Sequence, residues 1–179
     1  SEEETVEELV RRAEEKSRRI LEDSKKKVRD IERENDEILK RSRDRVKKAE
    51  DDLRRVVEKR DEEEVRKILE DLKRLLEKVI KTDEDIVKTS RDLLREVIKK
   101  DEEIVEKLKR LLRDMLEKAK DRGDERILRE LERVVEEIDR EHERTKEELK
   151  KVADESRKAH RESERDLERV IREVRERLR

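Results

Sequence analysis

The chain has 179 residues, 63% of them charged, with no Cys, no Pro and no aromatic residue, and its 55 Lys and Arg nearly balance 57 Asp and Glu. A balanced charge gives no overall attraction to nucleic acid or to an anionic membrane, and single strands find no aromatic ring to stack on. No run approaches the roughly 20 apolar residues of a membrane span, and thiolate metal sites are excluded. We therefore expect neither a nucleic-acid partner nor a membrane partner.

Buried-type positions recur every eighteen residues along the first predicted helix, residues 2–58. The set Val10, Ala13, Ser17, Ile20 and Ser24 recurs as Val28, Ile31, Asn35, Ile38 and Ser42, and then as Val46, Ala49, Leu53 and Val56. Eighteen residues make five turns of 3.6, so this stripe stays on one straight face. The phased apolar residues argue against disorder despite the high charge. Ser1 fits an N-cap, and Glu4 fits the capping-box position.

The second predicted helix, residues 62–121, begins with a phase jump. Continuing the first stripe past Val56 would bury Arg60 and Glu64, whereas the apolar positions move to Val65 and Ile68, a rotation of roughly a third of a turn. We predict a turn at 59–61, with Asp61 as the next N-cap. The inward arc of this helix spans roughly 140°, against roughly 100° for the other two helices.

The third predicted helix, residues 125–178, follows a turn at 122–124. Gly123 fits a C′ position and Asp124 an N-cap. Long helices joined by short turns must run antiparallel. The sequence therefore predicts an all-α fold: a straight antiparallel up-down-up three-helix bundle that forms one domain, residues 1–179.

Polar residues inside the stripes follow the same repeat. Ser17 repeats as Asn35, for example, and Asp83 repeats as Asp101. With the chain folded at both turns, the numbers of two residues at equal height add up to about 121 for helices one and two. For helices two and three they add up to about 245. The first predicted layer holds Asp83, His160, Asn35, Ser42 and Ser163, the second holds Asp101, His142, Ser17, Ser24 and Thr145, and Ser90 lies level with Ser156.

These layers have four candidate roles. A layer with every polar group paired fixes the register, because a shifted register leaves buried groups unpaired at about 1–3 kcal/mol each. One His and one Asp are too few ligands for zinc, and His142 and His160 are about 27 Å apart along a helix. A packed core offers a Ser-His-Asp set no oxyanion hole. A pH switch is open, although a nearby carboxylate tends to keep His protonated. We expect a register lock, with no catalytic residue, metal, cofactor or small-molecule substrate.

The wide arc of the middle helix has two interpretations. It packs against both neighbours, or it leaves an apolar flank for a helical partner or a second copy of the chain. The residues of this possible interface are Leu69, Leu76, Ile80, Val87, Leu94, Ile98, Val105, Leu112 and Leu116.

Over its whole length the chain resembles de novo designed, parametrically generated helical bundles with modular buried hydrogen-bond networks. The features that carry this resemblance are the eighteen-residue repeat, the Glu/Lys/Arg surface, the minimal turns and the repeated Asp83/His160 and Asp101/His142 layers. The class includes monomeric bundles, heterodimers of three helices plus one, and latch-type switches. The resemblance implies a structural scaffold without natural activity, or alternatively an interaction module that forms one component of a designed assembly.

Overall fold

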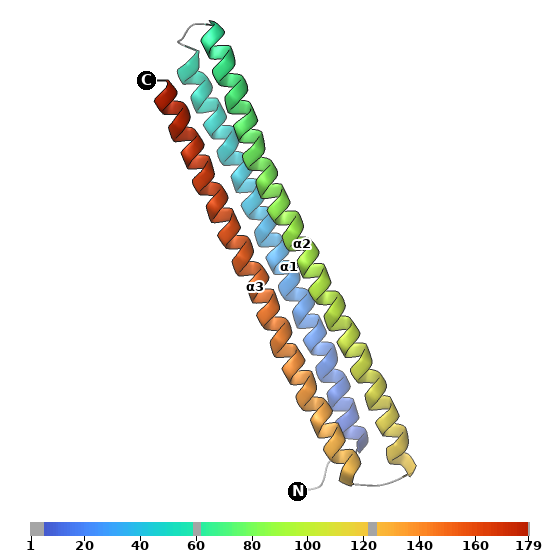
Figure 1. The fold of residues 1–179 in the computed structure, drawn as a ribbon. Helices are drawn as coiled ribbons and strands as arrows, with labels where there is room; N and C mark the ends of the chain where they lie inside the picture. Colours follow the sequence, from blue (N-terminus) through green and yellow to red (C-terminus); the bar gives the residue numbers. More distant parts are fainter. Residues whose placement is uncertain (1–5, 59–61, 122–124, 179) are drawn as a thin grey trace. The chain divides into compact units, whose positions relative to one another are not determined.

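A computed structural model describes residues 6–58, 62–121 and 125–178, and the fold is an all-α three-helix bundle (Figure 1). Helix α1 is Val6–Val57, α2 is Glu62–Asp121 and α3 is Glu125–Arg177. The described residues contain no strand. The predicted turns at 59–61 and 122–124, with their capping residues, lie outside the described residues, as do Ser1 and Glu4.

The chain divides into two compact units, and each unit contains a segment of all three helices. Unit 1 takes its described residues from Ser1–Asp30 and Leu93–Lys151, and unit 2 takes them from Ile31–Asp92 and Val152–Arg179. The sequence predicts a single domain of residues 1–179. The structure groups the described residues into two compact units, and the single domain stays a prediction.

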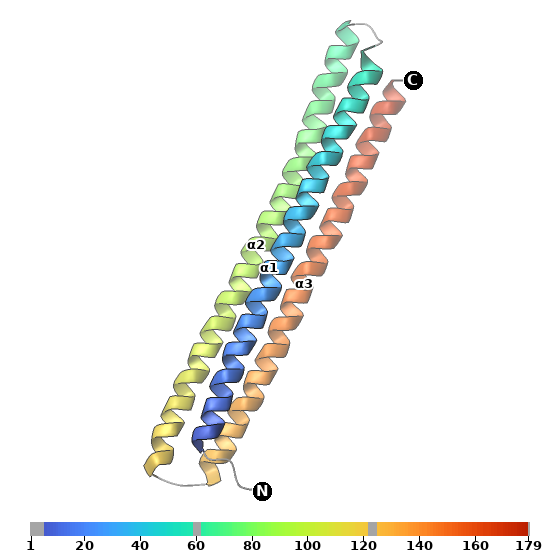
Figure 2. The same ribbon diagram turned by 180° about the vertical axis from the view of Figure 1, so that it is seen from behind.

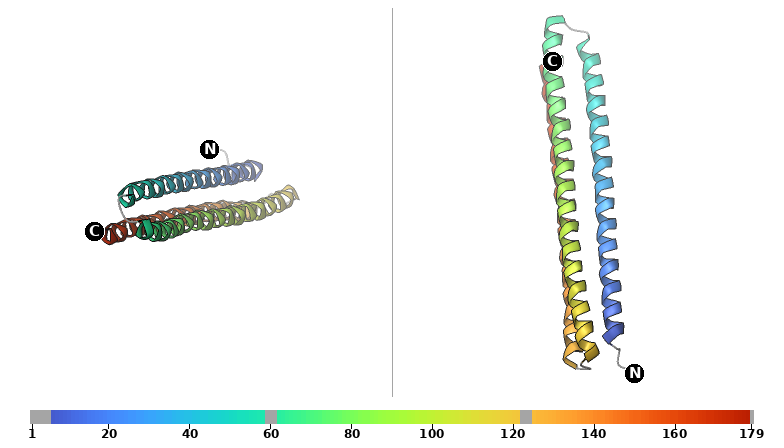
Figure 3. Two further views of the ribbon diagram at one scale, coloured as in Figure 1. Left: turned by 90° about the horizontal axis from the view of Figure 1, so that it is seen from above. Right: turned by 90° about the vertical axis from the view of Figure 1, so that its right-hand side faces the viewer.

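Ion pairs define the direction of the helices in unit 2. They include Arg43–Glu84, Asp36–Arg91, Glu34–Arg157 and Arg45–Glu164. Residue numbers that rise along α1 meet falling numbers in α2 and rising numbers in α3. Helix α2 is therefore antiparallel to α1 and α3 in this unit, as Figures 2 and 3 also show.

Each unit has its own apolar core, formed where the stripes of its three helix segments meet. The core of unit 2 contains Val46, Leu53, Val57, Ile68, Leu72, Leu76, Val79, Leu167, Val174 and Leu178. The core of unit 1 contains Val10, Ala13, Ile20, Leu108, Leu112, Leu131, Val134 and Ile138. Charged residues at the ends of α1 complement the helix dipole, with Glu7 and Glu8 in its first turn and Arg54 and Arg55 in its last.

The end of the α1 stripe differs from the prediction. Val56 continues the repeat, but its side chain is 51% exposed, and the neighbouring Val57 is fully buried instead. Val57 belongs to the same core cluster as Ile68 and Leu72 of α2. The same cluster also contains Leu167, Val174 and Leu178 near the end of the chain. The buried face at the end of α1 is therefore centred one residue away from the strict repeat.

These two adjacent valines provide a matched test of the packing at the end of α1. Val57→Ala should lower the free energy of unfolding by about 1.5–3 kcal/mol, because it removes buried methyl groups and leaves a cavity. Val56→Ala should change it by less than about 0.5 kcal/mol. Urea unfolding followed by circular dichroism at 222 nm measures both values, and equal costs would contradict the burial described here.

Candidate functional site

The Asn35 cluster consists of the buried side chains of Asn35, Ser90 and Ser156 in unit 2. The Nδ2 atom of Asn35 donates a hydrogen bond to Oγ of Ser90 at 2.7 Å. The hydroxyl of Ser156 donates to Oδ1 of Asn35 at 2.8 Å. A single carboxamide on α1 therefore bonds to α2 with its nitrogen and to α3 with its oxygen.

This grouping differs from the predicted layers, which placed Asn35 with Asp83 and His160. In bonded pairs of α1 and α2, the two residue numbers add up to 125 for Asn35 and Ser90 and to 127 for Lys25 and Glu102. The predicted sum was about 121. The difference is about one helical turn. A shift of one turn brings nearly the same faces together, so periodicity alone does not exclude it. It places Ser90, rather than Asp83, beside Asn35.

The position equivalent to Asn35 in unit 1 is Ser17, one repeat earlier. Its hydroxyl donates to the backbone carbonyl of Ala13 at 2.9 Å, within the same helix. The positions equivalent to Ser90 and Ser156 are the apolar Leu108 and Ile138, both buried. The Ser17 hydroxyl thus bonds within its own helix, where the neighbouring helices offer apolar side chains. This bond does not join Ser17 to the Asp101 layer in which it was predicted.

The Asp83 layer of unit 2 brings together Asp83, Ser42 and His160, with Ser163 buried alongside. The Ser42 hydroxyl donates to the Asp83 carboxylate. The Nδ1 atom of His160 lies 3.6 Å from Oδ1 of Asp83, beyond an ordinary hydrogen bond. Burial raises the pKa of Asp83, but its interactions with His160, Ser163 and Ser42 outweigh burial, so the pKa lies below its ordinary value of 3.8.

The Asp101 layer of unit 1 has similar residue types, with Thr145 in the slot of Ser163, but different contacts. The Thr145 hydroxyl donates to Oδ1 of Asp101 at 3.1 Å. Oδ2 of Asp101 and Nδ1 of His142 are buried without a hydrogen-bond partner. Burial raises the pKa of Asp101 above 3.8, and the hydroxyls of Thr145 and Ser24 offset that rise only in part. The eighteen-residue repeat therefore produces two layers with opposite pKa shifts at their carboxyl groups.

The predicted interface residues of α2 fall into two classes. Four of them are half-buried: Leu69, Ile80, Ile98 and Leu116. The other five are buried within the bundle: Leu76, Val87, Leu94, Val105 and Leu112. The most exposed leucines lie on the opposite edge of the arc instead. Leu93 and Leu111, both in unit 1, are each 38% exposed. They follow Leu75 at successive eighteen-residue intervals, and this pattern could have identified them as the exposed edge of the arc.

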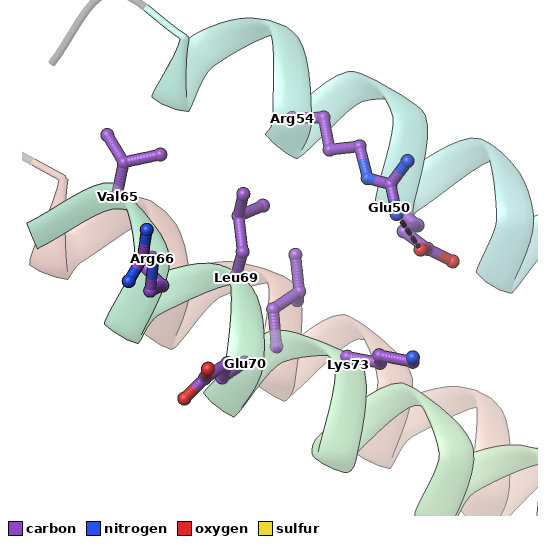
Figure 4. Close-up of a pocket in the computed structure, with 8 residues that line it drawn as sticks. Glu50, Arg54, Val65, Arg66, Leu69, Glu70 and Lys73 are labelled. Carbon is purple, nitrogen blue, oxygen red and sulfur yellow. Dashed lines mark hydrogen bonds and ion pairs between the residues drawn. The ribbon is translucent and has the colours of Figure 1, made fainter. Parts of the chain in front are cut away.

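A shallow groove lies between α1 and α2 in unit 2 (Figure 4). Val65 and Leu69 point from α2 toward α1. Glu50 and Arg54 of α1 form an ion pair with each other at 2.9 Å. That pair lies within one helix, so it does not bridge the groove, and the apolar floor stays partly open to solvent.

The described residues carry neither of two common site types. They contain no set of three or more His, Cys, Asp or Glu side chains placed to hold a metal ion. None of the described helices is both long and apolar enough to cross a membrane. No family model, curated protein or solved structure matches the chain. The candidate site is thus the set of buried polar residues itself.

Removing the Asn35 carboxamide should be costly. Asn35→Ala should lower the free energy of unfolding by about 2–4 kcal/mol, because two buried hydroxyls lose their partner. The triple variant Asn35→Leu, Ser90→Ala, Ser156→Ala should lie within about 1 kcal/mol of the parent, because no polar group is left unpaired.

The matched control for this series is Ser17→Ala in unit 1, which should cost about 1 kcal/mol or less since it removes a bond within one helix. Guanidinium unfolding curves give all four values. A cost for Asn35→Ala no larger than that for Ser17→Ala would contradict the bonding described for the Asn35 cluster.

The two buried aspartates should respond oppositely to neutralisation at pH 7. The lowered pKa of Asp83 means that its charge stabilises the fold above its ordinary pKa, and that this contribution is lost as the pH falls through the lowered pKa. The raised pKa of Asp101 means that its charge destabilises the fold until protonation at lower pH relieves the cost. Asp83→Asn should therefore be more destabilising than Asp101→Asn by about 1 kcal/mol or more.

Urea unfolding between pH 7 and pH 3 measures this comparison. Both differences from the parent should shrink toward acid, the one for Asp101→Asn at a higher pH than the one for Asp83→Asn. Equal effects of the two substitutions at pH 7 would show that the two carboxyl groups have equivalent surroundings.

Proposed function

We propose that the chain is a structural scaffold of designed origin, whose helix register is fixed by buried polar layers and which carries no catalytic activity of its own. The observation that carries the proposal is the Asn35 cluster, in which one buried amide bonds to both neighbouring helices. Such a contact adds little net stability, because folding replaces hydrogen bonds to water with this contact. Its main effect is to penalise every other alignment.

The role of the cluster follows from what shifted registers would do. Moving α1 along its axis would bring the Asn35 amide against apolar positions of unit 2 such as Leu72 or Val87, both buried. The unpaired amide would then cost several kcal/mol. A core with apolar residues at every height would tolerate such a shift, since leucine and valine pack acceptably in many helix registers. Polar residues at defined heights remove that ambiguity.

Designed origin is supported by the regularity of the pattern. The same slots are filled at eighteen-residue intervals in three helices, in a chain with no aromatic residue, one Gly and no Pro. Surface charges form ion pairs within helices, such as Lys100–Glu96, and between them, such as Lys16–Asp139. All the polar residues of the layers fit a structural use, and none of them needs a substrate.

A second candidate function is an interaction module. Leu93 and Leu111 expose apolar surface on the outer edge of α2 in unit 1, where a further helix or a second copy of the chain could bind. Five of the nine residues predicted for an interface are buried inside the bundle, which favours the scaffold over this alternative.

The mass in solution distinguishes the two functions. We expect 22.0 kDa, the mass of a single chain, from light scattering after size exclusion, with refractive-index detection because Trp and Tyr are absent. A multiple of that mass would favour the interaction module. In that event the double variant Leu93→Lys, Leu111→Lys should restore 22.0 kDa, whereas Val56→Lys, an exposed valine of unit 2, should leave the multimer intact.

A further inference from the structure

The two Asp/His layers lie one repeat apart, yet their histidines have different surroundings. His160 in unit 2 is only 5% exposed, and its imidazole faces the Asp83 carboxylate at 3.6 Å. His142 in unit 1 is half-buried at the edge of its core. Both layers contain buried atoms without a hydrogen-bond partner: Nδ1 of His142 and Oδ2 of Asp101 in unit 1, and Nε2 of His160 and Oδ1 of Asp83 in unit 2. A proton added to Nδ1 of His142 would therefore have no hydrogen-bond acceptor in the present arrangement.

Charges from all three helices act on His142. Burial lowers its pKa below the ordinary value of 6.5, and the ammonium groups of Lys146 on α3 and Lys27 on α1 lower it further. Glu143 on α3 and Asp101 on α2 act in the opposite direction but do not compensate. The local field thus favours the neutral imidazole in the folded protein.

We propose that unit 1 contains an acid-sensitive switch, in which protonation of His142 loosens the packing of α3 against α1 and α2 while unit 2 remains packed. The geometry that carries this inference is a half-buried imidazole whose Nδ1 atom is buried without a hydrogen-bond partner, in a layer whose carboxylate is bonded to Thr145. In unit 2, by contrast, the Nδ1 atom of His160 faces the Asp83 carboxylate at 3.6 Å, although its Nε2 atom is also buried without a partner.

The pH range follows from the sign of each shift. A His pKa that is lowered in the folded state means that stability is lost as the pH falls below the unfolded value of 6.5. The lowered pKa of Asp83 means that unit 2 loses the Asp83 contribution only below 3.8. Acidification from pH 7.5 to pH 5.5 should therefore weaken unit 1, whereas the contribution of the Asp83 carboxylate to unit 2 stays in place. Protonation of Asp101, whose pKa is raised, opposes this effect at still lower pH.

Hydrogen exchange measured by mass spectrometry on the whole chain tests the switch, with exchange times corrected for the intrinsic effect of pH. Peptides of α3 within residues 134–149 should lose about three- to tenfold in protection between pH 7.5 and pH 5.5. Peptides within residues 34–57 of unit 2 should keep theirs. Equal or greater protection of unit 1 at pH 5.5 would overturn the proposal.

Matched variants assign the effect to one imidazole. His142→Gln should abolish the pH dependence of unit 1, and His160→Gln should leave it in place. Asp101→Asn should enlarge it, because the carboxylate that favours the protonated imidazole is gone. Persistence of the full acid effect in His142→Gln would overturn the proposal.

A titration of the unmodified protein does not depend on the folding of any variant. The two histidines of the chain give two imidazole signals in NMR spectra, which the variants assign. The His142 signal should titrate with a midpoint below 6.5. A midpoint at or above 6.5 would show that the folded state favours the protonated form, and it would refute the switch.

Discussion

In the function we propose, the buried amide of Asn35 sets the strongest constraint on this fold. A carboxamide removed from water must find a donor and an acceptor inside the protein, or it costs several kcal/mol. Here Ser90 on α2 and Ser156 on α3 supply them. Because the two partners come from different helices, both hydrogen bonds form only when both helices are at the correct height. The surrounding leucines then pack in that register and do not have to select it themselves.

The eighteen-residue repeat gives core positions that are equivalent in geometry. The residues at these positions make some heights of the core apolar and others polar. In unit 2 the level of Leu53, Leu72 and Val174 is wholly apolar and belongs to the core cluster, so its contribution is mainly burial of apolar surface. The Asn35 level, one repeat away, contributes specificity. The layers of Asp83 and Asp101 show that similar residues in equivalent slots can still give opposite pKa shifts. The interactions of Asp83 with His160, Ser163 and Ser42 outweigh the effect of burial, whereas those of Asp101 with Thr145, Ser24 and His142 do not.

Much of this organisation follows from periodicity alone. The three helices, their inward stripes and the burial of residues such as Ser24, Ser90 and Ser156 are all readable from the eighteen-residue pattern, since amphipathic helices must bury their apolar faces. The partners of Asn35 were not readable, because a shift of one turn preserves the faces that meet. Nor did the pattern separate Val56 from Val57, because the burial of each depends on how the end of α1 packs in a core that both other helices share.

The side-chain amide of Asn35 offers the most direct test of the central claim, because the chain contains one Asn and no Gln. A nitrogen-15 NMR spectrum therefore has a single carboxamide pair of signals. Our account predicts that these protons exchange at least about a hundredfold more slowly than an exposed carboxamide and show nuclear Overhauser contacts to the β-protons of Ser90 and Ser156. Exchange at the rate of a free amide, with no contact to α2 or α3, would contradict it.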